Sequence, residues 1–257
     1  MFINNFDPVA FQILSFEIKW YSMAYIIGII LGWTYCKKKL IKDRHILAIF
    51  DDFITYLIIG IILGGRLGYT LFYNLEYYLE NPFEILMIWN GGMSFHGGLI
   101  GTIIATQLYS NQHKINQFIF LDLVALSAPI GIFFGRIANF INSELIGRAT
   151  ELPWSVQFIL IDNIKRHPSQ LYEAFFEGII LFILLWYFFR KNYLQRPGVI
   201  SALFLIFYSL FRFFIEFFRS PDLQIGYLFL NLTLGQLISI LFLIAGIFLF
   251  NLKNNEK

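Results

Sequence analysis

The stretch GRIANFINSELIGR, residues 135–148, decides the fold, because it places charged and amide side chains at the end of an apolar run. It holds Arg136, Asn139, Asn142 and Glu144 and ends on a second arginine. In hydrocarbon, an ionisable side chain costs about 3 kcal/mol or more unless it is paired or reached by water. The stretch therefore predicts a polar pocket near one face of a bilayer. A surface loop in which arginine and glutamate pair with each other is the simpler alternative.

The composition is that of a membrane protein. Of the 257 residues, 58% are hydrophobic and only 14% are charged, whereas about 25% of a soluble domain is charged. The formal net charge of +2 gives no indication of nucleic-acid binding, and we expect no such partner. Because Cys36 is the single cysteine, an internal disulfide and a cysteine-based metal site are excluded, and a catalytic thiol would come from a substrate. We expect neither a metal ion nor a cofactor.

Seven apolar segments approach the length of about 20 residues that a membrane-crossing helix needs. We expect an all-α polytopic protein, a single integral membrane domain over residues 1–257. A small external head, residues 142–167, is predicted between the fourth and fifth helices. The predicted helices are Trp20–Cys36, Phe53–Leu75, Met93–Gln112, Ile115–Gly135, a fifth that begins at Pro168 and includes Gly178–Phe189, Gly198–Arg219, and a seventh from about Asn231 to Leu252.

Basic residues divide unevenly between the two ends of these helices. Eleven fall on one side: Lys37, Lys38, Lys39, Lys42, Arg44, Lys114, Arg190, Lys191, Arg196, Lys253 and Lys257. Five fall on the other: Lys19, Arg148, Lys165, Arg166 and Arg219. Lysine and arginine collect on the cytoplasmic side, so the amino terminus is predicted outside and the carboxyl terminus inside. Arg66, Arg136 and Arg212 then lie toward the outer half of the membrane.

The segment GGMSFHGGLIG, residues 91–101, places His96 among glycines at the outer end of the third helix. Histidine titrates near neutral pH and serves as a general acid or base. Two plainer alternatives remain open. One is a hydrogen-bonded structural histidine, and the other is close helix packing through the glycines.

Two further helices carry polar side chains on one face. Tyr208, Arg212 and Glu216 recur every four residues on the sixth helix. Arg212 and Glu216 are able to neutralise each other, but a lipid-facing pair would be costly, so this face is predicted to turn inward. The fifth helix has a similar face, for which a functional role and plain interhelical hydrogen bonding are both open. Its polar residues are Gln170, Glu173 and Glu177.

Five motifs of the chain resemble those of the bacterial prolipoprotein diacylglyceryl transferase family, and they occur in the family's order. They are GGRLGYTLFY (Gly64–Tyr73), GGMSFHGGLIG (Gly91–Gly101), GRIANFINSELIGR (Gly135–Arg148), HPSQLYE (His167–Glu173) and Tyr208-x-x-x-Arg212-x-x-x-Glu216. Three departures concern local backbone geometry rather than chemistry. Ser22, Ser143 and Ser209 stand where the family usually has glycine.

The resemblance implies an enzyme of the bacterial cytoplasmic (inner) membrane with two substrates. It would transfer the diacylglyceryl group of phosphatidylglycerol to the thiol of the lipobox cysteine in a prolipoprotein signal peptide, and release glycerol phosphate. The family's catalytic residues match Tyr21, His96, Arg136, Asn139, Glu144, Tyr208, Arg212 and Glu216. Substrate-binding positions are expected at Arg136, Arg212, Arg66, Gly97, Gly98 and Asn142.

The chemistry of the residues agrees with this reaction. A free thiol has a pKa of about 8.5, so forming its thiolate requires a base or a positive field. The departing phosphate needs cations, for which the forked guanidinium groups of Arg136 and Arg212 are suited. We expect Glu144 and Glu216 to orient these arginines. Which residue accepts the thiol proton is left open.

Two other classes of protein compete with an enzyme. A transporter or flippase for an anionic lipid or metabolite also places arginines in a membrane cavity. It predicts charges spread through the bilayer depth and an inverted repeat, and no convincing repeat is visible in the chain. A purely structural membrane subunit leaves the polar insertions in the apolar segments unexplained.

Overall fold

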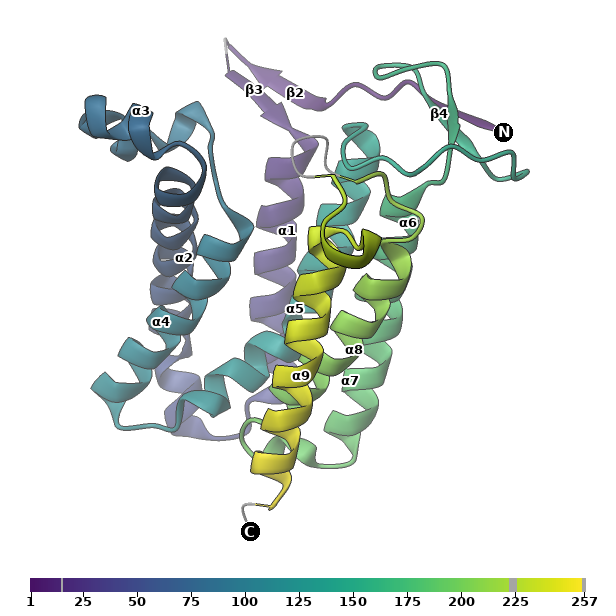
Figure 1. Cartoon of the computed structure of the whole chain (residues 1–257). Helices are drawn as coiled ribbons and strands as arrows, with labels where there is room; N and C mark the ends of the chain where they lie inside the picture. The colour runs from purple at the N-terminus through teal and green to yellow at the C-terminus, as the bar shows by residue number, and fades with distance from the viewer. Residues whose placement is uncertain (15, 222–225, 256–257) are drawn as a thin grey trace. The chain divides into compact units, whose positions relative to one another are not determined.

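The computed structural model describes residues 1–14, 16–221 and 226–255. Over these residues the chain is mostly helical (Figure 1). It forms two compact units. The first comprises Met1–Cys36 and Asp122–Lys257, and the second comprises Lys37–Leu121.

The first unit is a group of helices with short strands at one end. Its helices are α1 (Trp20–Tyr35), α5 (Gln117–Ile141) from Asp122 onward, α6 (Ser169–Glu173), α7 (Leu181–Arg190), α8 (Val199–Ile215) and α9 (Leu234–Asn255). A π-helical segment, Ala174–Ile180, joins α6 to α7 without a break. Small residues bring α1 and α5 together, because a Cβ on Gly28 would lie 2.9 Å from Gly131 Cα.

The second unit is built on the packing of α2 (Arg44–Tyr73) against α4 (Phe95–His113). Between them lie α3 (Leu75–Glu80) and two 3₁₀ turns, Pro82–Leu86 and Ile88–Asn90. Every fourth residue of α2 from Gly60 to Gly68 is glycine. These glycines face Gly97, Gly101 and Ala105 of α4 so closely that added side chains would collide with backbone atoms. The sequence alternative of close glycine packing is therefore confirmed.

In the part of the chain that the structure describes, there are five short strands, which were not predicted from the sequence. Strand β1 (Phe2–Asn4) pairs parallel with β4 (Val156–Phe158), which pairs antiparallel with β5 (Lys165–Arg166). A hairpin joins β2 (Val9–Ile13) to β3 (Phe16–Lys19) directly before α1 (Figure 1). Strands of two to five residues are too short to show a clear alternation of apolar and polar side chains.

Residues 142–167, the head segment, are thus anchored by the amino-terminal strand. Phe140, Val156 and Phe158 form a small buried core beneath this sheet. Arg166 binds Asp162, with 2.5 Å between Nη2 and Oδ2, and this hydrogen bond holds the pKa of the carboxyl below its usual range. Residues far apart in the sequence therefore build one compact structure above the ends of α5 and α6.

Each of the seven predicted helical segments is present, with shifted ends. The second begins at Arg44 instead of Phe53, because the Asp43 carboxylate caps it by accepting from the His45 and Ile46 amides. The fourth continues to Ile141. Among the described residues, four helices are long and apolar enough to cross a membrane: Arg44–Tyr73, Gln117–Ile141, Ser169–Arg190 and Leu234–Asn255. The chain is a multi-pass membrane protein, and the count of seven crossings stays a prediction.

We predict that Gly64→Ala destabilises the second unit, whereas Gly98→Ala does not. The new methyl group at position 64 would collide with the Gly97 carbonyl and lie 2.8 Å from Gly101 Cα, but at position 98 the nearest atom is 3.7 Å away. Overpacking of this kind costs about 1–3 kcal/mol. Thermal unfolding in detergent measures both variants, and equal midpoints would contradict the packing argument.

Candidate active site

Three helices of the first unit bring arginines and glutamates together inside the protein. Arg136 of α5 contacts two carboxylates, with 3.0 Å from Nη1 to Glu173 Oε2 and 3.2 Å from Nη2 to Glu177 Oε2. Arg212 of α8 also binds Glu173 through Nη1, and its Nη2 lies 2.8 Å from Glu216 Oε2. We call these five side chains, together with that of Arg219, the ion cluster.

Burial makes the ion cluster energetically important. The Glu173 and Glu177 side chains are fully buried, and the side chains of Arg136 and Arg212 are 17% and 12% exposed. Arg219 approaches the same Glu173 carboxylate at 3.7 Å. Three arginines and three glutamates give a formally neutral group, which avoids the large cost of unpaired buried charge.

Glu216 connects the ion cluster to the start of α9. Its Oε1 accepts a hydrogen bond from the Thr233 hydroxyl at 3.0 Å. Thr233 also begins α9 through a capping box, since the Gln236 amide nitrogen donates to Thr233 Oγ1 and the Thr233 amide donates to Gln236 Oε1. A side chain at Gly235 would meet the Glu216 carboxylate at 2.8 Å, so glycine permits this approach.

Glu144 occupies a polar turn directly after α5. It accepts hydrogen bonds from Asn139 Nδ2 at 3.0 Å and Asn142 Nδ2 at 3.4 Å. The turn needs Ser143 in the left-handed region, at φ +57°, which explains why glycine is usual there. The expected pairing of Glu216 with Arg212 is present, and the expectation that Glu144 orients the arginines stays a prediction. The carboxylates that contact Arg136 and Arg212 are those of Glu173, Glu177 and Glu216.

Two tyrosines that were predicted to be catalytic, Tyr208 and Tyr21, lie near charged residues of the ion cluster or of the polar turn. The Tyr208 hydroxyl on α8 is within electrostatic reach of Arg136, Arg212 and Glu177. Tyr21 on α1 shares a hydrogen bond of 3.1 Å with Tyr25 and interacts electrostatically with Glu144. The first unit therefore brings together most of the predicted catalytic residues, from α1, α5 and α8.

Arg66, expected at a substrate-binding position, contacts backbone carbonyls of its own unit. It is 3% exposed, and its guanidinium donates to the backbone carbonyls of the loop before α4. Nε lies 2.8 Å from Ile85 O and Nη2 3.2 Å from Met87 O, with Gly91 and Gly92 also accepting. Arg66 therefore supports this loop, and its expected substrate-binding role stays a prediction.

His96 lies in the first turn of α4, in the second unit. Ser94 caps this helix, accepting from the Gly97 amide at 3.2 Å, while the Ser94 amide donates to Gly65 O at 2.8 Å. Gly97 packs so closely against α2 that a side chain would not fit there, whether or not a ligand binds nearby. Gly98 has room around its Cα. Substrate-binding roles for Gly97 and Gly98 and a catalytic role for His96 stay predictions.

Several residues of the site were not assigned to it from the sequence. Glu173 and Glu177 appeared only as a polar helix face, and Arg219 only as a basic residue at a helix end. Gln170 Nε2 donates to Glu144 O at 2.6 Å and so joins α6 to the polar turn. Among the described residues, no group of three histidine, cysteine or acidic side chains could hold a metal ion.

The fold and the site define a class: a multi-pass helical membrane protein with buried arginines held by carboxylates. The family model for prolipoprotein diacylglyceryl transferase matches residues 8–252. The chain belongs to this family, as its motifs indicated, and it is a transferase.

Relatives from several Rickettsia species match almost the whole chain. A protein of Rickettsia bellii (strain OSU 85-389) is 50% identical over 252 residues, which covers 97% of this chain and 96% of the relative. A protein of Rickettsia typhi is 49% identical over 263 residues, with both chains fully covered. One of Rickettsia canadensis is 50% identical over 249 residues, or 96% of each chain. All three are named phosphatidylglycerol–prolipoprotein diacylglyceryl transferase.

We predict that Glu173→Gln strongly destabilises the protein, because Arg136, Arg212 and Arg219 lose the carboxylate that they share. Breaking one partner of a buried ion pair typically costs about 3–5 kcal/mol. Glu151→Gln is the matched control, since Glu151 is 86% exposed where it pairs with Lys165. Such surface pairs contribute about 0–1 kcal/mol. Thermal unfolding in detergent compares the two variants, and equal losses would show that the ion cluster does not stabilise the fold.

Proposed function

We propose that the protein transfers the diacylglyceryl group of phosphatidylglycerol to the thiol of the lipobox cysteine of prolipoproteins. The products are a thioether-linked lipoprotein precursor and glycerol phosphate. The names of the Rickettsia relatives support this assignment of both substrates. The observation that carries it in the structure is the meeting of Arg136 and Arg212 in one ion cluster.

The reaction exchanges one bond for another. The cysteine sulfur forms a bond to the glyceryl carbon, and the bond between that carbon and the phosphate oxygen breaks. Its electron pair leaves with the phosphate, which changes from a diester to a monoester and gains negative charge. The thiol proton goes to a base, for which His96, Tyr21 and Glu144 are the candidates.

The arginines of the ion cluster are suited to the leaving group. A guanidinium has five N–H donors in a rigid fork, and the carboxylate contacts of Arg136 engage its two terminal nitrogens. Glu173 and Glu177 hold the two guanidinium groups close together before substrate arrives. An interaction that strengthens as the phosphate gains charge lowers the barrier, not only the lipid dissociation constant.

The competing class considered from the sequence, a lipid transporter, is not favoured by the placement of the ionisable groups. It predicts ionisable groups spread through the membrane depth. Asp122 is such a group, buried near the start of α5, but its carboxylate accepts from the Gly198 and Ser201 amides, both at 2.8 Å, and so caps α8. The ion cluster lies toward the opposite end of α5, which favours the enzyme.

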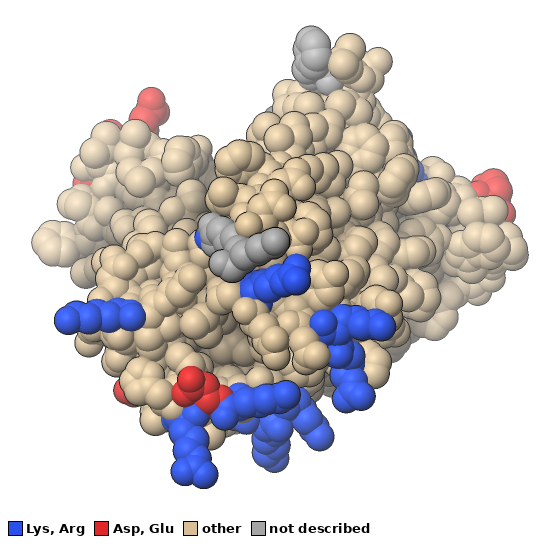
Figure 2. Space-filling model, turned by 90° about the horizontal axis from the view of Figure 1, so that it is seen from below, with Lys and Arg blue, Asp and Glu red and all other residues tan. Residues whose placement is uncertain are grey.

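We also propose seven membrane crossings in one integral membrane domain, with the head segment outside and the carboxyl terminus in the cytoplasm. At the end of the first unit away from the head segment, Arg196 on the turn after α7 donates to Asn254 of α9 at 2.8 Å. Lysine and arginine are the main charged side chains on the face seen from below (Figure 2). A basic face of this kind supports the cytoplasmic assignment.

We predict that Arg136→Lys and Arg212→Lys each reduce transfer strongly, although both keep the charge. Purified protein, phosphatidylglycerol and a peptide with a lipobox cysteine are incubated, and mass spectrometry detects the diacylglyceryl thioether. Because lysine cannot grip two phosphate oxygens as a fork does, we expect turnover at saturating lipid to fall about 10²-fold or more. Full turnover in both variants would contradict the leaving-group role. Lipid movement between leaflets without any thioether from the unaltered protein would favour the transporter.

We predict that an impermeant thiol reagent added outside cells labels a cysteine at position 160 but not one at position 254. Each cysteine is introduced into a Cys36→Ser background, so that no native thiol contributes. The expected result follows from the asymmetry of basic residues. Labelling at 254 without labelling at 160 would reverse the proposed orientation.

A further inference from the structure

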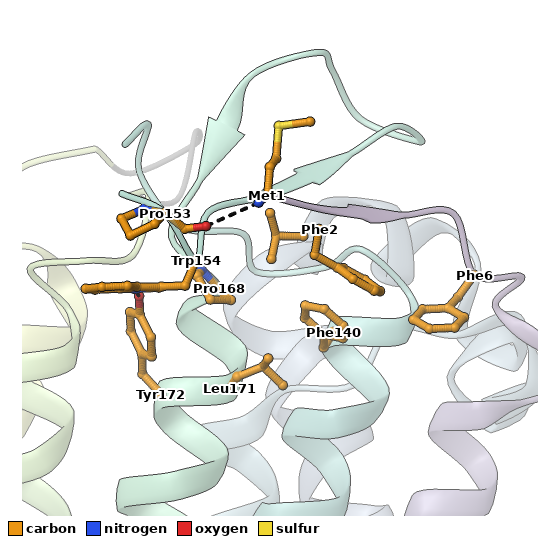
Figure 3. A pocket seen from close by; sticks show the side chains of 10 residues that line it. Met1, Phe2, Phe6, Phe140, Pro153, Trp154, Pro168, Leu171 and Tyr172 are labelled. Carbon is orange, nitrogen blue, oxygen red and sulfur yellow. Dashed lines mark hydrogen bonds between the residues drawn. The ribbon is translucent and has the colours of Figure 1, made fainter. Parts of the chain in front are cut away.

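The first unit contains an apolar hollow that is lined by none of the ion-cluster residues (Figure 3). Its volume is about 610 Å³. The walls come from the amino-terminal segment, the head segment and the ends of two helices. Among the lining residues are Phe2, Phe6, Phe140, Trp154, Leu171 and Tyr172.

The polar atoms at the walls of the hollow already have partners. Trp154 Nε1 donates to the Tyr172 hydroxyl at 2.9 Å, and the amino group of Met1 donates to Pro153 O at 3.2 Å. The hollow therefore offers apolar surface and not hydrogen bonds. Its occupant must be apolar where it touches these walls.

Two aromatic residues of the lining are substantially exposed. Trp154 is 57% exposed and Phe2 is 47% exposed. A contiguous apolar patch on the water-facing side of a protein marks a site of interaction. In the proposed topology the head segment lies outside the membrane, where a polypeptide substrate is present and lipid tails are not.

The hollow lies about one helical turn from the candidate active site along α5, and next to it along α6. Phe140 on its floor follows Asn139 directly and lies four residues beyond Arg136, which is about 6 Å along an α-helix. Tyr172 directly precedes Glu173. An extended peptide advances about 3.3 Å per residue, so a peptide with its cysteine at the ion cluster reaches the hollow after about two residues.

We propose that this hollow binds an apolar side chain of the polypeptide substrate, about two residues from the reacting cysteine. The proposal rests on the proposed function, because it assumes that the substrate thiol reacts beside Arg136 and Arg212. It assigns the recognition of the peptide to the head segment and the amino-terminal segment, and that of the lipid phosphate to the ion cluster. An acyl chain of the lipid is the competing occupant.

The test uses Trp154→Ala and two pairs of synthetic lipobox peptides. In each pair, leucine or alanine stands at the second position before or after the cysteine. The hollow lies on one side of the reacting cysteine, so only the leucine peptide of one pair should reach it. For that peptide we expect the variant to raise KM roughly tenfold, the size of effect that lost methylene contacts produce in an apolar pocket. The matched alanine peptide should change much less, and KM for phosphatidylglycerol should not change. Leu160→Ala is the control. Leu160 also lies in the head segment and is 55% exposed, and this variant should behave like the unaltered protein.

Two results would overturn the proposal. An equal change in KM for the leucine and alanine peptides would mean that Trp154 serves the fold alone. A change in KM for phosphatidylglycerol alone would assign the hollow to an acyl chain. Trp154→Phe removes the donor to Tyr172 but keeps an aromatic wall. Because the apolar contact is kept, this variant should retain the KM for the leucine peptide. Failure of the proposed function itself is recognised separately, because the unaltered protein would then form no thioether with any peptide.

Discussion

The pairing of buried arginines with the Glu173 carboxylate is the interaction on which the first unit depends. Arg136 and Arg212 both bind this carboxylate, and Arg219 lies 3.7 Å from it. Because successive residues of an α-helix point about 100° apart, turning α5, α6 or α8 by one residue would leave charged groups unpaired. The cost of such an error in a dry interior is several kcal/mol per ion. The ion cluster therefore fixes the rotation of three helices that apolar packing alone would leave less well defined.

The same helices carry the head segment. Asn4 Nδ2 donates to Phe140 O at 2.6 Å, which ties the first strand to the end of α5. Gly147 lies against the backbone of His167 with no space for a side chain, and its carbonyl accepts from the Ser220 hydroxyl after α8. These contacts join the head segment to the helices that carry the ion cluster.

The sequence was sufficient for the helices, the family and the four-residue spacing of Arg212 and Glu216, because each of these is a local pattern. It did not reveal which carboxylate meets Arg136, since that depends on how α5 and the π-helical segment are rotated against each other. The partners of Arg66 could not be predicted for a similar reason. An arginine in an apolar segment predicts a buried partner, and only the 3₁₀ turns before α4 show that backbone carbonyls fill that role. The strands escaped notice because two to five residues carry too little periodicity.

The ion cluster is formally neutral without substrate, and this neutrality affects how strongly it would bind a phosphate. Carboxylates beside the arginines weaken their attraction for a phosphate, so tight binding of the lipid is not what the arrangement favours. Glu173 and Glu177 fix the positions of Arg136 and Arg212. In the proposed reaction, little reorganisation would then be needed when charge develops on the leaving phosphate. Glu216, held by Thr233, likewise fixes the other terminal nitrogen of Arg212. In the proposed reaction the lipid substrate is itself a component of the membrane, so weak binding would be sufficient and the electrostatic stabilisation would act mainly in the transition state.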